Sequence, residues 1–221
     1  MSTNRFNEQI FQEMPIIGIL RNISLEDISH ILPHYLASGL TTLEITMNSP
    51  AAEDSIRFAV EKYAGKLNIG AGTVCDMHEL ELALSAGAQF IVTPIINEDV
   101  IKECVKRKIP IFPGAYTATE IYNAWKLGAS RIKVFPATSL GPNHFKDLKG
   151  PFPNIKLVAT GGISLDNLVA FLEAGISGFG IGSTLFNKAY IKEKKWAELF
   201  EVFCRYQQLV KNYFEKNKNG N

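Results

Sequence analysis

The feature that most constrains this chain is an alternation, repeated eight times, between a short apolar run and a longer segment whose apolar residues have helical spacing. This alternation is typical of parallel β/α units, and eight such units close a sheet into a barrel. The sequence therefore predicts an α/β fold, a single-domain (β/α)8 TIM barrel. The strands are expected at residues 16–20, 42–47, 67–72, 90–94, 109–114, 131–136, 155–160 and 178–183.

Several helices between these strands have recognisable start signals. The expected first residues or caps are Ser24, Asp76, Asn97, Thr117 and Ser164. After the sixth strand, glycines and prolines on both sides confine the segment 143–149, so we expect a reduced helix there.

We expect residues 1–221 to form one domain, because a barrel of this kind typically needs about 250 residues and leaves no room for a second. The barrel is expected over about 15–190 and a C-terminal packing helix over about 194–214, followed by a disordered tail. An open doubly wound sheet would show an early GxGxxG turn, which is absent.

The composition indicates which partners and which cellular compartment to expect. The 23 basic and 22 acidic residues are mixed along the chain and give a net charge of +1, so neither nucleic acid nor a membrane is an expected partner. No apolar run approaches the roughly 20 residues of a membrane span, and the N-terminus lacks the apolar centre of a secretory signal. Cys75, Cys104 and Cys204 are odd in number and lie far apart, so we expect a protein of the reducing cytoplasm.

Two charged residues are expected inside the barrel. Ile132 and Val134 share the outer face of their strand, so strand alternation turns Lys133 inward, and the same rule turns Glu44 inward. Burying an unpaired charge costs several kcal/mol, which calls for a reason. One reason is a structural ion pair between the two. The other is catalysis, in which a desolvated Lys133 amine attacks a carbonyl and Glu44 relays protons.

Glycine-rich turns follow the seventh and eighth strands. Gly161 and Gly162 end one strand, and Gly182 and Ser183 end the next. Barrels often bind phosphate on exposed backbone N–H groups at this location, although tight turns alone would also explain the glycines. Because both pairs occur together, we predict a phosphate site.

Residues at the ends of the first and third strands could bind an anion. Thr73 follows a run of small residues and could meet a carboxylate. Arg21 follows the first strand and could pair with a carboxylate or phosphate, or be an ordinary solvated arginine. All four histidines fall outside the strand ends, so we expect no metal ion and no other cofactor.

Taken together, these motifs resemble the 2-keto-3-deoxy-6-phosphogluconate (KDPG) aldolases and their 2-keto-3-deoxy-6-phosphogalactonate and 4-hydroxy-2-oxoglutarate relatives. The resemblance runs from about residue 15 to 186. It rests on ILR (19–21), LEIT (43–46), IGAGTV (69–74), VTP (92–94), FPG (112–114), IKVFPA (132–137), GPFPN (150–154), ATGGI (159–163) and GIGS (180–183).

The resemblance implies a class I aldolase, typically a homotrimer, with Lys133 as the Schiff-base residue and Glu44 as the proton acceptor and donor. It also implies a phosphorylated keto acid as substrate. The implied substrate contacts are Arg21, Thr73, Pro94, Phe135 and Thr160, with phosphate near Gly161, Gly162 and Ser183.

Asn48 departs from the pattern, because many KDPG aldolases have an arginine there that meets the pyruvate carboxylate. This leaves Arg21 as the natural carboxylate partner, with Asn48 as a further contact. The NSP segment resembles the galactonate relatives, whereas residues 140–167 resemble the gluconate enzymes. We expect cleavage of the gluconate compound, possible activity on 4-hydroxy-2-oxoglutarate, and the galactonate compound as the alternative. A phosphosugar isomerase or epimerase and a catalytically silent binding protein are the remaining readings.

Overall fold

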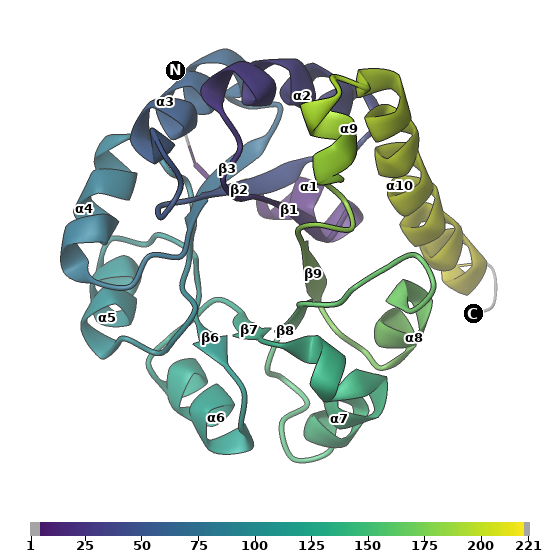
Figure 1. The fold of residues 1–221 in the computed structure, drawn as a ribbon. Coiled ribbons are helices and arrows are strands. Elements are labelled where there is room, and N and C mark those ends of the chain that lie inside the picture. The colour runs from purple at the N-terminus through teal and green to yellow at the C-terminus, as the bar shows by residue number, and fades with distance from the viewer. Residues whose placement is uncertain (1–4, 219–221) are drawn as a thin grey trace.

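The structure is a computed structural model and describes residues 5–218. Its strands form a closed parallel ring with helices around it (Figure 1). The strands are β1 (Ile16–Leu20), β2 (Thr42–Thr46), β3 (Asn68–Gly72), β4 (Ile91–Val92), β5 (Ile111–Phe112), β6 (Gly114–Ala115), β7 (Ile132–Val134), β8 (Leu157–Thr160) and β9 (Gly178–Ile181).

The ring closes at a proline. The strand order β5-β4-β3-β2-β1-β9-β8-β7-β6 places β5 and β6 at opposite ends of the sheet, yet only Pro113 separates them in the chain. Proline has no N–H to donate, so the ladder is interrupted there. Together β5 and β6 form the fifth barrel strand, which was expected as one segment over 109–114. The predicted (β/α)8 barrel is confirmed.

Most helices follow a strand and, apart from the first helix, they lie outside the ring (Figure 1). Ser24, Asp76, Asn97 and Thr117 each accept a backbone hydrogen bond at the start of a helix, as predicted. The helical segments are α1 (Glu8–Glu13), α2 (Leu25–Ala37), α3 (Ala52–Tyr63), α4 (Met77–Ser85), α5 (Glu98–Lys106), α6 (Ala118–Lys126), the 3-10 turn η1 (Ala137–Ser139), α7 (Gly141–Lys149), α8 (Leu168–Glu173), α9 (Lys188–Lys192) and α10 (Trp196–Lys218).

The expected reduced helix is at a different place. Helix α7 has nine residues, because Pro142 lies in its first turn, where a missing N–H costs nothing. Helix α8 has six residues and begins at Leu168 rather than at Ser164, because the Asn167 side chain accepts a hydrogen bond from the Ser164 N–H and holds a turn.

The C-terminal helix is longer than expected. Helix α10 continues to Lys218, so residues 215–218 are helical and the prediction of a disordered tail is wrong for them. Residues 219–221 lie outside the described residues.

The buried apolar side chains form an outer and an inner group. Ile132, Val134, Leu43 and Ile45 belong to the outer group, which fills the space between the strands and the helices. The inner group fills the interior of the barrel toward the end where the strands begin. It consists of Phe11, Ile17, Phe90, Val92, Phe112 and Val158.

Helix α1 covers the end of the barrel where the strands begin. The Thr41 hydroxyl, just before β2, donates to the carbonyl of Ile10 at 3.1 Å, and the Asn7 N–H donates to the side chain of Asn68 in β3 at 2.7 Å. Phe11 of α1 is fully buried against Phe112. The opposite end, where parallel strands place the functional groups of such barrels, is therefore where a ligand can enter.

Candidate active site

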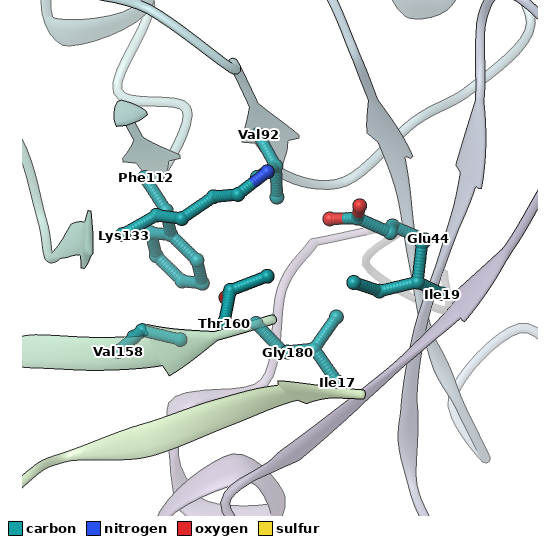
Figure 2. Close-up of a pocket in the computed structure, with 9 residues that line it drawn as sticks. All are labelled: Ile17, Ile19, Glu44, Val92, Phe112, Lys133, Val158, Thr160 and Gly180. Carbon is teal, nitrogen blue, oxygen red and sulfur yellow. The ribbon is translucent and has the colours of Figure 1, made fainter. Parts of the chain in front are cut away.

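Lys133 and Glu44 both point into the barrel, as strand alternation predicts. They line a small interior cavity of about 10 Å³ together with apolar side chains of β1, β4, β5 and β8. In the ring, β2 and β7 are separated by three strand positions on either side, so the two charges approach from opposite walls (Figure 2). The volume of this cavity is about that needed for one water molecule.

These two residues do not form an ion pair. No nitrogen–oxygen distance between Lys133 and Glu44 falls within 4.0 Å, and none of the described residues forms a hydrogen bond with either side chain. The alternative of a structural ion pair between them is therefore wrong. The ion pair nearby is formed by Arg131, the residue before β7, whose buried guanidinium binds the half-exposed carboxylate of Glu8.

Burial acts on the two charges in opposite directions. It raises the pKa of the Glu44 carboxyl, and the Lys133 charge offsets this only in part. Burial lowers the pKa of the Lys133 amine, Glu44 opposes the change, and Arg21 adds to it. Both shifts favour the neutral forms, which suits a nucleophilic amine beside a proton-carrying carboxyl.

Two glycines make room for the reactive side chains. A Cβ at position 72 would overlap the carboxyl of Glu44, and a Cβ at position 180 would overlap the hydroxyl of Thr160. The glycines of β3 and β9 therefore let these polar groups lie flat against the barrel wall.

Above the cavity, a pocket of about 720 Å³ opens to the end of the barrel where the strands finish. Lys133 and Thr160 line both spaces, so the amine lies at the boundary between them. The pocket brings together most of the residues predicted to contact substrate. They are Arg21, Thr73, Pro94, Phe135, Thr160, Gly161, Gly162, Gly182 and Ser183.

One wall of the pocket presents donors suited to a carboxylate. The Arg21 guanidinium donates to the Thr73 hydroxyl at 3.1 Å. The loop behind Arg21 is fixed by Ser49, whose hydroxyl accepts from the Asn22 N–H at 2.8 Å and shares a 2.8 Å hydrogen bond with Thr46. The loops after β1 and β2 are thereby tied together under Arg21.

The opposite wall contains the glycine turn after β8. Gly161 and Gly162 have φ angles of 91° and 72°, a region that glycine adopts without steric cost. The Thr138 hydroxyl donates to the Gly161 carbonyl at 2.9 Å, and its side chain occupies the place where a Cβ of residue 162 would be. The glycine turn therefore packs against η1. Backbone N–H groups in such a turn are of the kind that bind phosphate.

Asn48 is the predicted site residue that the structure does not bring to the pocket. It is exposed on the turn after β2 and is not part of the pocket lining. Sequence reasoning also missed residues that do line the pocket, namely Asn22, Asp27, Lys188 and Lys192. The spacing of four between Lys188 and Lys192, shortly after Ser183, was the available signal for the last two.

Two further observations concern the described range only. Within residues 5–218, no group of three or more His, Cys, Asp or Glu side chains is placed to hold a metal ion. No helix of that same range is long and apolar enough to cross a membrane.

A (β/α)8 barrel with an unpaired interior lysine at the base of an open pocket defines the class: this is a class I, Schiff-base aldolase, a carbon–carbon lyase. The chain belongs to the KDPG and KHG aldolase family, whose model matches residues 7–202. Membership of this family favours aldol cleavage over isomerisation or epimerisation.

Individual relatives cover nearly the whole chain. The 2-dehydro-3-deoxy-6-phosphogalactonate aldolase of Escherichia coli is 34% identical over 90% of this chain and 97% of its own length. The 2-dehydro-3-deoxy-phosphogluconate aldolase of Pseudomonas aeruginosa is 36% identical over 84% of this chain and 83% of its own.

Solved structures of aldolases are also similar to this chain. One described as the native KDPGal structure superposes with a TM-score of 0.87 at 30% identity, covering 96% of this chain and 99% of that one. The KDPG aldolase of Legionella pneumophila, with pyruvate captured as a covalent carbinolamine intermediate, has a TM-score of 0.83 at 27% identity, covering 90% and 96%.

Proposed function

We propose that this enzyme cleaves 2-keto-3-deoxy-6-phosphogluconate to pyruvate and glyceraldehyde 3-phosphate, with Lys133 as the nucleophile and Glu44 as the proton relay. The observation that carries the proposal is that these two residues face each other across a cavity of about 10 Å³ without pairing. One water fits there, and both formation and hydrolysis of a Schiff base exchange one water.

In the proposed reaction, the neutral Lys133 amine attacks the C2 ketone, and loss of water assisted by Glu44 gives an iminium. Glu44, directly or through a water, removes the proton of the C4 hydroxyl, and the C3–C4 electron pair moves into the iminium. Glyceraldehyde 3-phosphate leaves and an enamine of pyruvate remains. Protonation at C3 and hydrolysis release pyruvate and the free amine. No metal ion or organic cofactor takes part.

The pocket walls suit the two ends of this substrate. Arg21 and Thr73, joined by a hydrogen bond, are assigned to the carboxylate. Phosphate is assigned to the glycine turn and to Gly182 and Ser183. Pro94, Phe135 and Thr160 line the same pocket and are assigned to the reacting carbons between these ends. Remote contacts of this kind position the bond to be broken.

The galactonate epimer is the second candidate substrate. It is favoured by the Asn48-Ser49-Pro50 segment and by the similarity to the E. coli enzyme named for that compound. Asn48 does not line the pocket, so the support from this segment rests on the sequence alone. A contact of Asn48 with substrate stays a prediction.

Sodium borohydride trapping with pyruvate tests the Schiff base. Mass spectrometry should place a reduced three-carbon adduct on Lys133, and an adduct on another lysine, or none, would overturn the assignment. Pyruvate release from the two epimers, measured with a coupled dehydrogenase, then tests the substrate. A higher kcat/KM for the galactonate compound would replace the gluconate proposal and leave the mechanism intact.

We also propose a homotrimer in the cytoplasm. Ile95, Tyr116 and Phe135 are large, exposed apolar residues on loops after β4, β6 and β7, so they lie at the same end of the barrel as the pocket. A neighbouring subunit would cover them and shield the pocket. The three free cysteines are in keeping with a reducing compartment. Light scattering on the purified protein tests the trimer.

A further inference from the structure

The pocket extends past the phosphate turns to the short helix α9. Its lining continues from Gly182 and Ser183 through Thr184 to Lys188 and Lys192. Helix α9 lies on the rim of the barrel beside α2 and α10 (Figure 1). A spacing of four residues places both lysines on one face of α9.

These two lysines have no partner within the described part of the chain. No ion pair or hydrogen bond joins Lys188 or Lys192 to any residue of 5–218. Their neighbours differ, because Lys194 pairs with Asp27 at 2.6 Å and Lys195 pairs with Glu193 at 2.6 Å. The unpaired cations of this segment are the ones that line the pocket.

Asp27, an acidic residue that lines the same pocket, does not neutralise Lys188 and Lys192. Asp27 lines the pocket, but its carboxylate is held by Lys194 and by the Ser24 hydroxyl at 2.7 Å. Near α9 the pocket therefore presents two free ammonium groups. An anion of more than one charge is the guest that this wall would attract most.

We propose that Lys188 and Lys192 bind the phosphate end of the substrate from the α9 side and set the preference for phosphorylated over unphosphorylated keto acids. This inference rests on the proposed function. Glycine-turn N–H groups supply directional hydrogen bonds, whereas the lysines supply charge against a group that carries about −1.5 to −2 at pH 7. The two sets of donors approach the same group from different loops.

The test compares Lys188→Ala, Lys192→Ala and the double variant with Lys195→Ala, an exposed lysine of the same segment outside the pocket. For the phosphorylated substrate, KM should rise about threefold in each single variant and about tenfold in the double variant, with kcat nearly unchanged. The rise should weaken with added salt. Lys188→Arg with Lys192→Arg should restore KM.

Two readouts separate a phosphate contact from a general defect. Cleavage of unphosphorylated 2-keto-3-deoxygluconate and borohydride trapping of pyruvate should be the same in the double variant and the wild type. A KM for the phosphorylated substrate that changes no more than in Lys195→Ala would overturn the proposal. A parallel loss of pyruvate trapping would overturn it as well.

The inference and the proposed function can fail separately. Absence of a Lys133 adduct in the wild type is a failure of the proposed function alone. Binding of inorganic phosphate, measured by calorimetry, needs no catalysis and decides the role of α9 in that case. The double variant should bind free phosphate about tenfold more weakly than Lys195→Ala, and equal binding would sink the assignment.

Discussion

Two buried cations lie two residues apart in the chain, and within the described range only one of them is paired with a carboxylate. Arg131 is 3% exposed and Lys133 is 5% exposed. Arg131 is bound by Glu8, with its Nη1 at 3.1 Å from Oε2, and packs over the rings of Phe11 and Phe112. Lys133 faces Glu44 across a cavity without touching it.

The carboxylates of Glu8 and Glu44 also differ, because only Glu8 is bound by a cation in the part of the chain that the structure describes. Burial acts to raise the pKa of Glu8, but the hydrogen bonds and charge of Arg131 outweigh it and leave the pKa below its ordinary value. For Glu44 burial prevails and the pKa is raised. Burial alone therefore does not mark a reactive charge. The absence of a contacting group of opposite charge does, because it leaves the neutral form accessible.

The largest expected effect is the loss of catalysis in Lys133→Ala. Cleavage should fall by about 10⁴-fold or more, because the nucleophile is removed. Lys133→Met should do the same and leave the free energy of unfolding unchanged or raised by about 1 kcal/mol, because a buried, unpaired charge is replaced by an apolar chain. Urea denaturation checks this. Loss of folding in both variants would mean that the lysine has a structural role.

Glu44→Gln should have the next largest effect. Cleavage should slow by about 10²- to 10³-fold, since proton relay is lost while the amine remains. Borohydride trapping with pyruvate should still label Lys133, at a lower rate. Complete loss of trapping, with an unchanged circular dichroism spectrum, would show that Glu44 is needed to form the adduct as well.

On the structural side of the comparison, Glu8→Ala should lower the free energy of unfolding by roughly 2 kcal/mol, because it leaves Arg131 buried without its partner while Glu8 itself is half-exposed. The activity of the folded enzyme should be nearly unchanged. The folded-state pKa of Glu8 is lowered, so its contribution is complete at neutral pH and is lost as the pH falls through that value. Glu8→Ala and wild type should therefore converge in acid.

The pH dependence of adduct formation tests the lowered pKa of Lys133. Because the pKa of Lys133 is lowered, the trapping rate should rise about tenfold per pH unit and level off below the ordinary lysine value of about 10.4. Glu44 acts to raise that pKa, so Glu44→Gln should move the midpoint to lower pH. A midpoint at or above the ordinary value would contradict the desolvated amine.

A smaller effect is expected at Ser49, which lies behind Arg21. Ser49→Ala removes the acceptor of the Asn22 N–H, so KM for substrate should rise about fivefold while kcat changes little. Thr46→Ser retains a hydroxyl beside Ser49 and should behave as wild type. Equal KM values in the two variants would mean that the loop needs no such support.

The barrel was predictable because each strand carries its own pattern. Alternation of Ile132, Lys133 and Val134 fixed which side chain points inward, and the two outer residues do pack beneath the helices. Most of the pocket residues could also be predicted, because groups at the ends of parallel strands converge at one end of a barrel. Helices α8 and α7 were less predictable, because a turn held by Asn167 delays the start of α8 and a proline begins α7 instead of confining it.

Sequence by itself determined the fold, the inward direction of Lys133 and Glu44, and the glycine turns, because these depend on local period and on the conformational range of single residues. Only the tertiary structure decided that Arg131 pairs with Glu8, that Lys133 forms no ion pair with the residues the structure describes, and that α9 turns Lys188 and Lys192 into the pocket. Each of these depends on distances between segments remote in the chain. Charge pairing falls off over a few ångströms, so those distances separate a structural cation from a reactive one.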